Sequence, residues 1–308
     1  MNDIGFVGLG RMGGNMARRL RRSGVSVAGF NRNAELTTVL ARETGLQAAD
    51  SLQQLVRSLS MPRVVWLMVP AGDATQQTVD LLATLLSPHD IVVDGGNSYY
   101  KDSVRRAGEL ARSGIRFVDA GVSGGIWGLE NGYALMVGGE TGTVAAIERF
   151  LKLLAPTPQS GWLHCGPVGA GHYVKMIHNG IEYGMMQALA EGLSLLRSRT
   201  EFGLDLAAIS EMWRHGSVVR SWLLDLTAEF LKSDQKLDAI APYVADSGEG
   251  RWTAIEAIEQ GVPAPVMSLA LMARFASQGR DDFSAQLLSM MRKGFGGHAV
   301  RAEGEGRD

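Results

Sequence analysis

The strongest chemical signal in this sequence is a stripe of four polar side chains in an otherwise apolar or small-residue segment. They lie at helical positions i, i+3, i+4 and i+7: Lys175, His178, Asn179 and Glu182. This spacing places them on one face of a helix. The pattern predicts a buried helix with a single ionisable stripe, and buried charges must be paired or bound to a ligand.

Two interpretations of this stripe stay open. The side chains could form a structural hydrogen-bond network, or they could contact different atoms of one substrate. Seven residues separate Lys175 from Glu182, or ~10 Å of helix rise, which strains direct pairing. A desolvated lysine has a lowered pKa and can serve as a base, whereas a buried glutamate has a raised pKa and can serve as an acid. The separation therefore favours catalysis.

A second signal is a G-x-G-x-x-G fingerprint near the amino terminus. It consists of Gly8, Leu9, Gly10, Arg11, Met12 and Gly13. The fingerprint follows a strand pattern and opens a helix pattern, which is the arrangement that a dinucleotide pyrophosphate needs. The alternative is a tight turn without a ligand, but the context favours a nucleotide, because N–H groups at a helix start attract phosphate.

The residues after the second predicted strand bear on the choice of cofactor. An acidic side chain there binds the ribose 2′-hydroxyl of NAD, whereas a basic one suits the 2′-phosphate of NADP. This sequence has Asn31 and Arg32 at that point. An arginine can pair with phosphate in bidentate fashion, so NADP is the preferred cofactor, with NAD as the alternative. Val69 ends the next predicted strand and Asn97 follows the one after it, and both are expected beside the same cofactor.

The elements that must position these residues change character along the chain. In the first half, β-branched apolar runs alternate with helical patterns, which is typical of βαβ units and a parallel sheet. The predicted strands are 4–7, 25–30, 64–69, 91–94, 116–119, 133–137 and 161–164, and the predicted helices are 11–23, 34–44, 51–59, 75–86 and 102–113. A turn at 130–132 indicates that part of the sheet is antiparallel.

After residue 166 the patterns are helical throughout. They cover 169–196, 204–214, 218–231, 252–259, 263–277 and 282–293. We therefore expect an α/β Rossmann-type dinucleotide-binding domain over residues 1–166. An all-α domain for substrate binding and dimerisation, ending in a carboxyl-terminal tail, is expected over residues 167–308.

Composition narrows the class of protein further. The chain has 308 residues, of which 45% are hydrophobic and 20% charged, enough for a sizeable core. A net charge of -2 argues against a nucleic-acid partner. The sequence contains no apolar run long enough to span a membrane, and no signal peptide is recognisable. The single cysteine, Cys165, and the lack of a Cys/His cluster predict neither a disulfide nor a metal site. The expected location is the cytoplasm.

Several segments resemble the 6-phosphogluconate dehydrogenase (decarboxylating) family, in its short form, within the β-hydroxyacid dehydrogenase superfamily. The helical stripe with the preceding residues 169–172 is similar to the family signature, and residues 5–13 are similar to its amino-terminal fingerprint. Residues 94–98 and 119–125 match its substrate-side loops. The segments 178–183 and 95–97 are more particular to this enzyme than the features that all β-hydroxyacid dehydrogenases share.

The resemblance implies a role for each matching residue. Lys175 would take the proton of the substrate 3-hydroxyl, and Glu182 would protonate C1 after decarboxylation. Contacts to the sugar acid are implied for Asn97, Ser123, Gly124, Gly125, His178, Asn179 and Tyr183. Arg274 matches an arginine that holds the phosphate. Near the carboxyl end, Arg292 and His298 match residues that reach into a neighbouring subunit's site, which implies a homo-oligomer. Glycines 294, 296 and 297 would allow that tail an extended path.

The chain also departs from the family pattern. It is shorter than the best-known members, and its glycine-rich lysine loop is shortened to 246–252. The phosphate-contacting lysine has no clear counterpart there, and Arg251 is the candidate substitute. Short forms often prefer NAD and carry an acidic residue where Asn31 stands, which leaves the cofactor preference open.

The resulting prediction is an enzyme of the pentose phosphate pathway. It would oxidise and decarboxylate 6-phospho-D-gluconate to D-ribulose 5-phosphate and CO2 while reducing NADP or NAD, without a metal. The alternative enzyme is a dehydrogenase of another β-hydroxyacid such as 3-hydroxyisobutyrate. It would keep Lys175 and Asn179 but would not need Glu182, Arg274 or Arg292. The alternative of another class is a non-catalytic NADPH-binding sensor, which gives no reason for a complete acid/base stripe.

Overall fold

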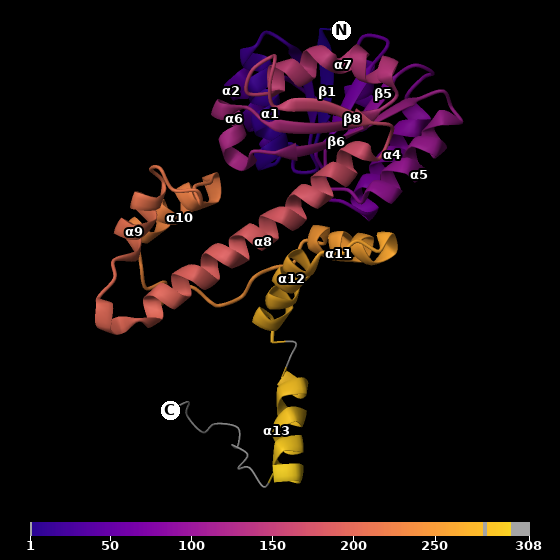
Figure 1. Cartoon of the computed structure of the whole chain (residues 1–308). Coiled ribbons are helices and arrows are strands. Elements are labelled where there is room, and N and C mark those ends of the chain that lie inside the picture. The colour runs from indigo at the N-terminus through magenta and orange to yellow at the C-terminus, as the bar shows by residue number, and fades with distance from the viewer. Residues whose placement is uncertain (1, 280–281, 297–308) are drawn as a thin grey trace. The chain divides into compact units, whose positions relative to one another are not determined.

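The chain forms an α/β unit followed by a helical unit, as the sequence predicts (Figure 1). The computed structural model describes residues 2–279 and 282–296. The first compact unit ends at His178 and the second begins at Asn179. One long helix, α8 (Ala170–Ser198), starts in the first unit and continues into the second. Throughout the described ranges, no helix has the length and apolar character needed to cross a membrane.

The first unit is built on one eight-stranded sheet in the order β3-β2-β1-β4-β5-β6-β7-β8. Its strands are β1 (Asp3–Val7), β2 (Ser26–Phe30), β3 (Gln47–Ala48), β4 (Val64–Leu67), β5 (Ile91–Asp94), β6 (Arg116–Ser123), β7 (Ala134–Gly139) and β8 (Trp162–Gly166). All neighbours are parallel except β6 and β7, which are antiparallel. The antiparallel pair confirms the prediction made from the turn at 130–132. Only a short segment joins these two strands, so the chain reverses direction there.

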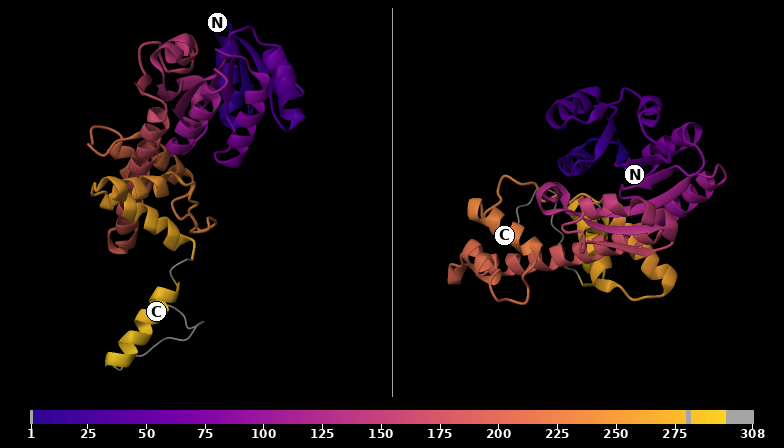
Figure 2. Two further views of the ribbon diagram at one scale, coloured as in Figure 1. Left: turned by 90° about the vertical axis from the view of Figure 1, so that its right-hand side faces the viewer. Right: turned by 90° about the horizontal axis from the view of Figure 1, so that it is seen from above.

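Helices cover both faces of this sheet because its strands alternate between two cores. Along β4, Val64 and Trp66 belong to one core, and Val65 and Leu67 belong to the other. Side chains of α1, α2 and α7 fill the first core, whereas those of α3, α4 and α5 fill the second. Helices therefore flank the strands on both sides (Figures 1 and 2). The bounds are α1 (Arg11–Arg22), α2 (Ala34–Thr44), α3 (Leu52–Arg57), α4 (Asp73–Leu85), α5 (Tyr100–Ala111), η1 (Gly125–Trp127), α6 (Gly128–Asn131) and α7 (Thr141–Leu154).

The strand order reverses between β1 and β4. From β1 the chain moves outward through β2 and β3, and then returns to place β4 on the other side of β1. In open α/β sheets, ligands bind in the crevice at the carboxyl ends of the strands beside such a reversal. The loops that follow β1, β2, β4 and β5 meet at this edge, and they carry the predicted cofactor residues.

The second unit is helical over its described residues. After α8 it contains η2 (Thr200–Phe202), α9 (Leu206–Trp213), α10 (Trp222–Ser233), α11 (Glu249–Gln260), α12 (Pro265–Ser277) and α13 (Asp282–Gly296). An ion-pair cluster joins α9 to α10, since Glu211 pairs with Lys232, and Arg214 pairs with both Glu211 and Asp225. Helix α11 packs closely on α8, because a Cβ at Gly180 would lie 2.6 Å from Thr253 Cγ2.

Candidate active site

The turn between β1 and α1 has glycines with two different functions. Gly8 has a φ of +91°, and a Cβ there would lie 2.4 Å from the Met68 carbonyl oxygen. A Cβ at Gly13 would lie 2.0 Å from the Gly8 carbonyl oxygen. Both positions therefore exclude a side chain because of close packing. Gly10 differs, since a Cβ there would meet no atom within 4 Å. It leaves open space at the start of α1, where a pyrophosphate is expected to bind.

A cavity of about 680 Å³ opens at this turn. Of the predicted cofactor residues, its walls include Gly8, Gly10, Met12, Asn31, Arg32, Val69 and Asn97. Leu9, Arg11 and Gly13 do not line it. The Leu9 side chain is buried against Gly29, Gly13 packs on Gly8, and Arg11 is exposed. The cavity, the open face at Gly10 and the helix start fit a dinucleotide.

The end of β2 presents an arginine to this cavity. The Leu9 N–H donates to Asn31 Oδ1 over 3.0 Å, and Asn31 Nδ2 donates to the Asn33 carbonyl over 3.2 Å. The Asn31 amide is thus engaged in holding the fingerprint turn. Arg32 is exposed and lines the cavity. Its guanidinium can bind a ribose 2′-phosphate there, but it does not exclude a ribose that lacks one.

Lys175 lies against the carboxyl half of β6. A Cβ at Gly121 would lie 2.3 Å from Lys175 Cβ and 2.9 Å from its Cγ, so the lysine stem occupies the place of the missing side chain. Only 7% of Lys175 is exposed. A glycine in the strand therefore lets the helix approach closely enough to seat the lysine at the edge of the sheet.

The start of α8 is fixed by a second residue of β6. The Asp119 carboxylate is fully buried and accepts hydrogen bonds from the Gly169 N–H over 2.7 Å and the His172 N–H over 2.8 Å. A carboxylate at a helix start satisfies unpaired N–H groups and complements the helix dipole. Asp119 thereby sets the entry of the helix that carries Lys175.

The loop after β6 brings another predicted pair together. Ser123 ends β6, and its Oγ lies 3.5 Å from His178 Nε2. Gly124 has a φ of +131° and Gly125 a φ of +53°, so the chain turns through conformations that disfavour side chains. Exposed backbone N–H groups in such a turn can bind a carboxylate or hydroxyl of a substrate.

The stripe on α8 is confirmed as a helical face, but the prediction of a buried helix holds only in part. Lys175, Asn179 and Tyr183 are buried, and His178 and Glu182 are half-buried. Among the apolar positions of the same helix Met176 is buried, whereas Ile181, Met185 and Met186 are 51%, 42% and 40% exposed.

In the second unit, Tyr183 and Arg274 form one cluster. The Arg274 guanidinium carbon lies 3.5 Å from the centre of the Tyr183 ring, and its Nη1 donates to the Ala245 carbonyl over 2.8 Å. The Tyr183 hydroxyl is 3.1 Å from Ser247 Oγ. Helix α12 thus supplies a cation, fixed by stacking and a hydrogen bond, beside the tyrosine of α8.

Arg251 lies next to this cluster. Its Nε pairs with the Asp246 carboxylate, and its guanidinium stacks over the Phe275 ring at 4.6 Å. Burial raises the pKa of Asp246, but hydrogen bonds from Arg251 and the Gly248 N–H outweigh it and leave that pKa below its usual value. The shortened loop therefore holds a second arginine close to Arg274.

The two tail residues differ in what the structure describes. Arg292 is exposed on α13, and His298 lies outside the described residues. The prediction of an extended path is wrong as far as Gly296, because α13 continues through that residue. Glycine lowers helix propensity but does not exclude helical backbone.

Sequence reasoning did not assign roles to the buried residues that support the site. Asp94, Asp119 and Arg106 are all at most 1% exposed. The two aspartates stand in motifs that the sequence already marked. The signal for Arg106 is its spacing of three and four residues from Ser103 and Leu110, which places it on the buried face of α5. In the described part of the chain, no His, Cys, Asp and Glu side chains group as metal ligands would.

Comparison with known families covers almost the whole chain. Residues 3–166 match the model for the NAD binding domain of 6-phosphogluconate dehydrogenase, and residues 171–305 match that for its C-terminal domain. The chain belongs to the 6-phosphogluconate dehydrogenase family. This confirms the resemblance and gives NAD or NADP as the cofactor.

Individual members of the family show where this chain stands. The NAD(+)-dependent, decarboxylating 6-phosphogluconate dehydrogenase of Haloferax volcanii is 42% identical over 97% of this chain and 98% of its own. The Plasmodium falciparum 6-phosphogluconate dehydrogenase, solved apo, with NADP+ and with 6-phosphogluconate, is 29% identical with a TM-score of 0.83, over 99% of this chain and 67% of its own. A Mycobacterium tuberculosis 3-hydroxyisobutyrate dehydrogenase shares the fold at 24% identity and a TM-score of 0.72, over 95% and 99%.

Proposed function

We propose that this chain oxidises and decarboxylates 6-phospho-D-gluconate to D-ribulose 5-phosphate and CO2, with NADP or NAD as the oxidant. The observation that carries the proposal is the position of Lys175, the first residue of the α8 stripe, which Gly121 and Asp119 seat against β6 within a chain of this family. The cofactor cavity, lined in part by Asn97, lies in the same unit.

The proton transfers are assigned to two residues of α8. Lys175, in its neutral form, takes the proton of the 3-hydroxyl. When bound in the cavity lined by Gly10, Arg32 and Asn97, a dinucleotide would supply the oxidant for C3, as a hydride acceptor. The 3-keto acid then loses its carboxylate as CO2, because the ketone accepts the electron pair of the breaking bond. Decarboxylation leaves an enediolate, and Glu182 protonates it at substrate C2, which becomes C1 of the product, so that the carbonyl at C3 re-forms.

The remaining site residues hold the substrate. Asn97, Ser123, Gly124, Gly125, His178 and Asn179 are assigned to the sugar acid. Tyr183 and Arg274 are assigned to the phosphate end, where the Arg274 guanidinium is already fixed by the Tyr183 ring and the Ala245 carbonyl. Arg251 takes the place of the family's lysine, supported by its position beside Phe275 near Arg274. Two arginines near one tyrosine suit a phosphate dianion.

A direct test uses the change in absorbance at 340 nm that accompanies reduction of the dinucleotide. The wild-type chain should turn over with 6-phosphogluconate and not with 3-hydroxyisobutyrate. Lys175→Met should lower kcat by about 10²–10⁴-fold and leave dinucleotide binding unchanged, because the lysine acts on the substrate. Turnover of 3-hydroxyisobutyrate alone would contradict the substrate assignment. Activity of Lys175→Met close to that of the wild type would contradict the base.

The chain is also proposed to act as a homo-oligomer in which Arg292 and His298 complete a neighbouring site. Exposed apolar side chains on three helices support association, including Met185, Leu269 and Leu288 at 42%, 67% and 60%. Exposed large apolar side chains in such number are typical of proteins that associate. A two-fold dimer would complete both sites reciprocally.

Mixing inactive chains tests this arrangement. A Lys175→Met chain and a chain truncated before Arg292 should each be inactive. Their heterodimer contains one site with both an intact lysine and an intact tail, so part of the activity should return. If subunit exchange is verified by mass spectrometry and no activity returns, the tail does not act across the interface.

A further inference from the structure

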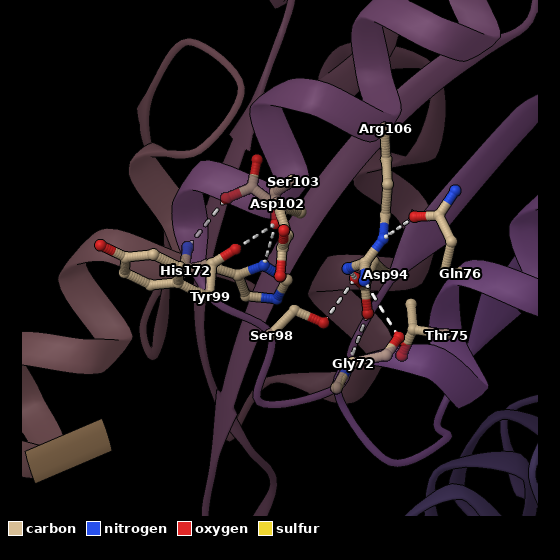
Figure 3. Close-up of polar contacts among 12 residues, drawn as sticks. Gly72, Thr75, Gln76, Asp94, Ser98, Tyr99, Asp102, Ser103, Arg106 and His172 are labelled. Carbon is tan, nitrogen blue, oxygen red and sulfur yellow. Dashed lines mark hydrogen bonds and ion pairs between the residues drawn. The ribbon is translucent and has the colours of Figure 1, made fainter. Parts of the chain in front are cut away.

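One buried carboxylate holds the chain on both sides of Asn97. Asp94 ends β5 and is fully buried. Its Oδ1 accepts a hydrogen bond from the Gly96 N–H over 3.1 Å, and its Oδ2 accepts one from Ser98 Oγ over 2.7 Å (Figure 3). Gly95, Gly96 and Ser98 are buried, whereas Asn97 is exposed to the cofactor cavity. The carboxylate thus fixes the residues before and after the one that faces the ligands.

A buried arginine connects this loop to a second wall of the cavity. Arg106 of α5 is 1% exposed, and its Nη1 lies 3.4 Å from Asp94 Oδ2. Its Nε donates to Gln76 Oε1 over 3.0 Å, and its Nη2 donates to the Gly72 carbonyl over 3.2 Å (Figure 3). Gly72 and Gln76 belong to the turn and first residues of α4. Their neighbours 69–71, 74 and 77 line the cavity.

The position of the Asp94–Arg106 ion pair says more about its role than its contribution to folding stability does. Burial of two charges costs desolvation free energy that their attraction does not always recover, so a buried ion pair is weak evidence for a role in stability. The planar guanidinium of Arg106, however, can hold several hydrogen-bond acceptors in place at once. Here the acceptors lie at the start of α4 and at the end of β5. Both segments adjoin residues that line one cavity, and the second is followed by Asn97.

We propose that Asp94 and Arg106 are positioning residues that hold Asn97 at the junction of cofactor and substrate. The inference rests on the role of Asn97 in the proposed function. Neither Asp94 nor Arg106 lines the cavity. Arg106 acts through Asp94, and Asp94 acts through its bonds to Gly96 and Ser98. Loss of these bonds should displace the Asn97 amide and lower the rate, while the dinucleotide cavity stays formed.

The same strand provides a matched control. Asp90 directly precedes β5 and is fully buried, and it pairs with Arg63 over 2.9 Å. This second Arg–Asp pair stands at the amino end of β5, away from the ligand edge. Arg63→Lys and Arg106→Lys therefore make the same chemical change at opposite ends of one strand. Both substitutions keep the positive charge but remove the guanidinium that binds several acceptors, so both should lower the melting temperature.

The experiment measures kcat and KM with 6-phosphogluconate, the Kd for NADP without substrate, and the melting temperature. Arg106→Lys should lower kcat by roughly 10- to 100-fold, because a displacement of about 1 Å can cost that much. Arg63→Lys should keep kcat within about twofold of the wild type, and Ser98→Ala should show a smaller loss than Arg106→Lys. In the pair Asn97→Ala and Arg106→Lys, the double variant should have nearly the kcat of Asn97→Ala alone, because both changes remove one function.

Three results would overturn the inference. Multiplicative losses in the double variant would mean that Arg106 does not act through Asn97. Equal losses of kcat in Arg63→Lys and Arg106→Lys would indicate a general effect of stability. Wild-type kinetics of Asn97→Ala would remove the role of Asn97 in the proposed function and this inference with it, whereas the first two results leave that function intact. If Arg106→Lys does not fold, the same cycle with Ser98→Ala and Asn97→Ala applies the same criterion.

Discussion

Replacement of Gly121 by alanine should disable catalysis by displacing Lys175. The new Cβ would lie 2.3 Å from Lys175 Cβ and 2.9 Å from its Cγ, with the Gly171 carbonyl oxygen 3.2 Å away. Carbon atoms in contact prefer ~3.5–4.0 Å. The strand and the helix must therefore separate by roughly 1 Å. Relief by rotation of the lysine stem is not available, because its Cβ is fixed to the backbone of α8.

The magnitude follows from this displacement. A shift of about 1 Å at a catalytic group can cost about 10²-fold in rate, and overpacking in a close contact costs about 1–3 kcal/mol of stability. Gly121→Ala should thus lower kcat by about two orders of magnitude in the 340 nm assay. The Kd for NADP should change little, because Gly121 does not line the cofactor cavity.

A glycine without neighbours supplies the control. A Cβ at Gly108, on the exposed face of α5, would meet no atom within 4 Å. Gly108→Ala should raise stability by about 0.5–1 kcal/mol, since alanine favours a helix interior, and leave kcat unchanged. If Gly121→Ala retains kcat and melting temperature close to those of the wild type, Lys175 is not held against β6 as described.

Three further changes test other parts of the chain. Arg32→Ala should raise KM for NADP about 10- to 150-fold more than KM for NAD, because only NADP offers a 2′-phosphate for a charged hydrogen bond; equal changes would show that Arg32 does not read the phosphate. Asp119→Asn should lower stability by about 1–3 kcal/mol and reduce kcat, because the two N–H groups at the start of α8 bind different carboxylate oxygens and an amide has only one oxygen. An unchanged melting curve would refute the capping role. Hydrogen bonds from Lys232, Arg214 and His215 lower the pKa of Glu211 to about 2, below its ordinary 4.5, so the unfolded chain binds more protons in this window and stability must fall as pH drops from 4.5 towards 2. Glu211→Gln should flatten that part of the urea-unfolding profile against pH, and an unaltered slope would contradict the cluster.

Features that depend on neighbours along the chain could be predicted from the sequence. Apolar runs rich in β-branched residues predicted seven of the strands, and helical periodicity predicted α8 and the later helices. The fingerprint at Gly8–Gly13 and the stripe from Lys175 to Glu182 are local patterns, so both could be recognised before any contact was known. Strand β3 was missed because two residues are too few to form an apolar run. Helix α7 was missed although its apolar residues recur at helical spacing.

The distant residues that support these patterns are visible only in the folded chain. Gly121 meets Lys175, and Arg106 reaches Asp94, Gln76 and Gly72, through the packing of elements far apart in the chain. Sequence periodicity does not reveal these contacts, because the contacts depend on strand order and on how closely a helix approaches the sheet. For the same reason the sequence could not show that Ile181, Met185 and Met186 of α8 remain exposed. Burial is a property of everything that packs around a helix, whereas periodicity reports only which residues share its face.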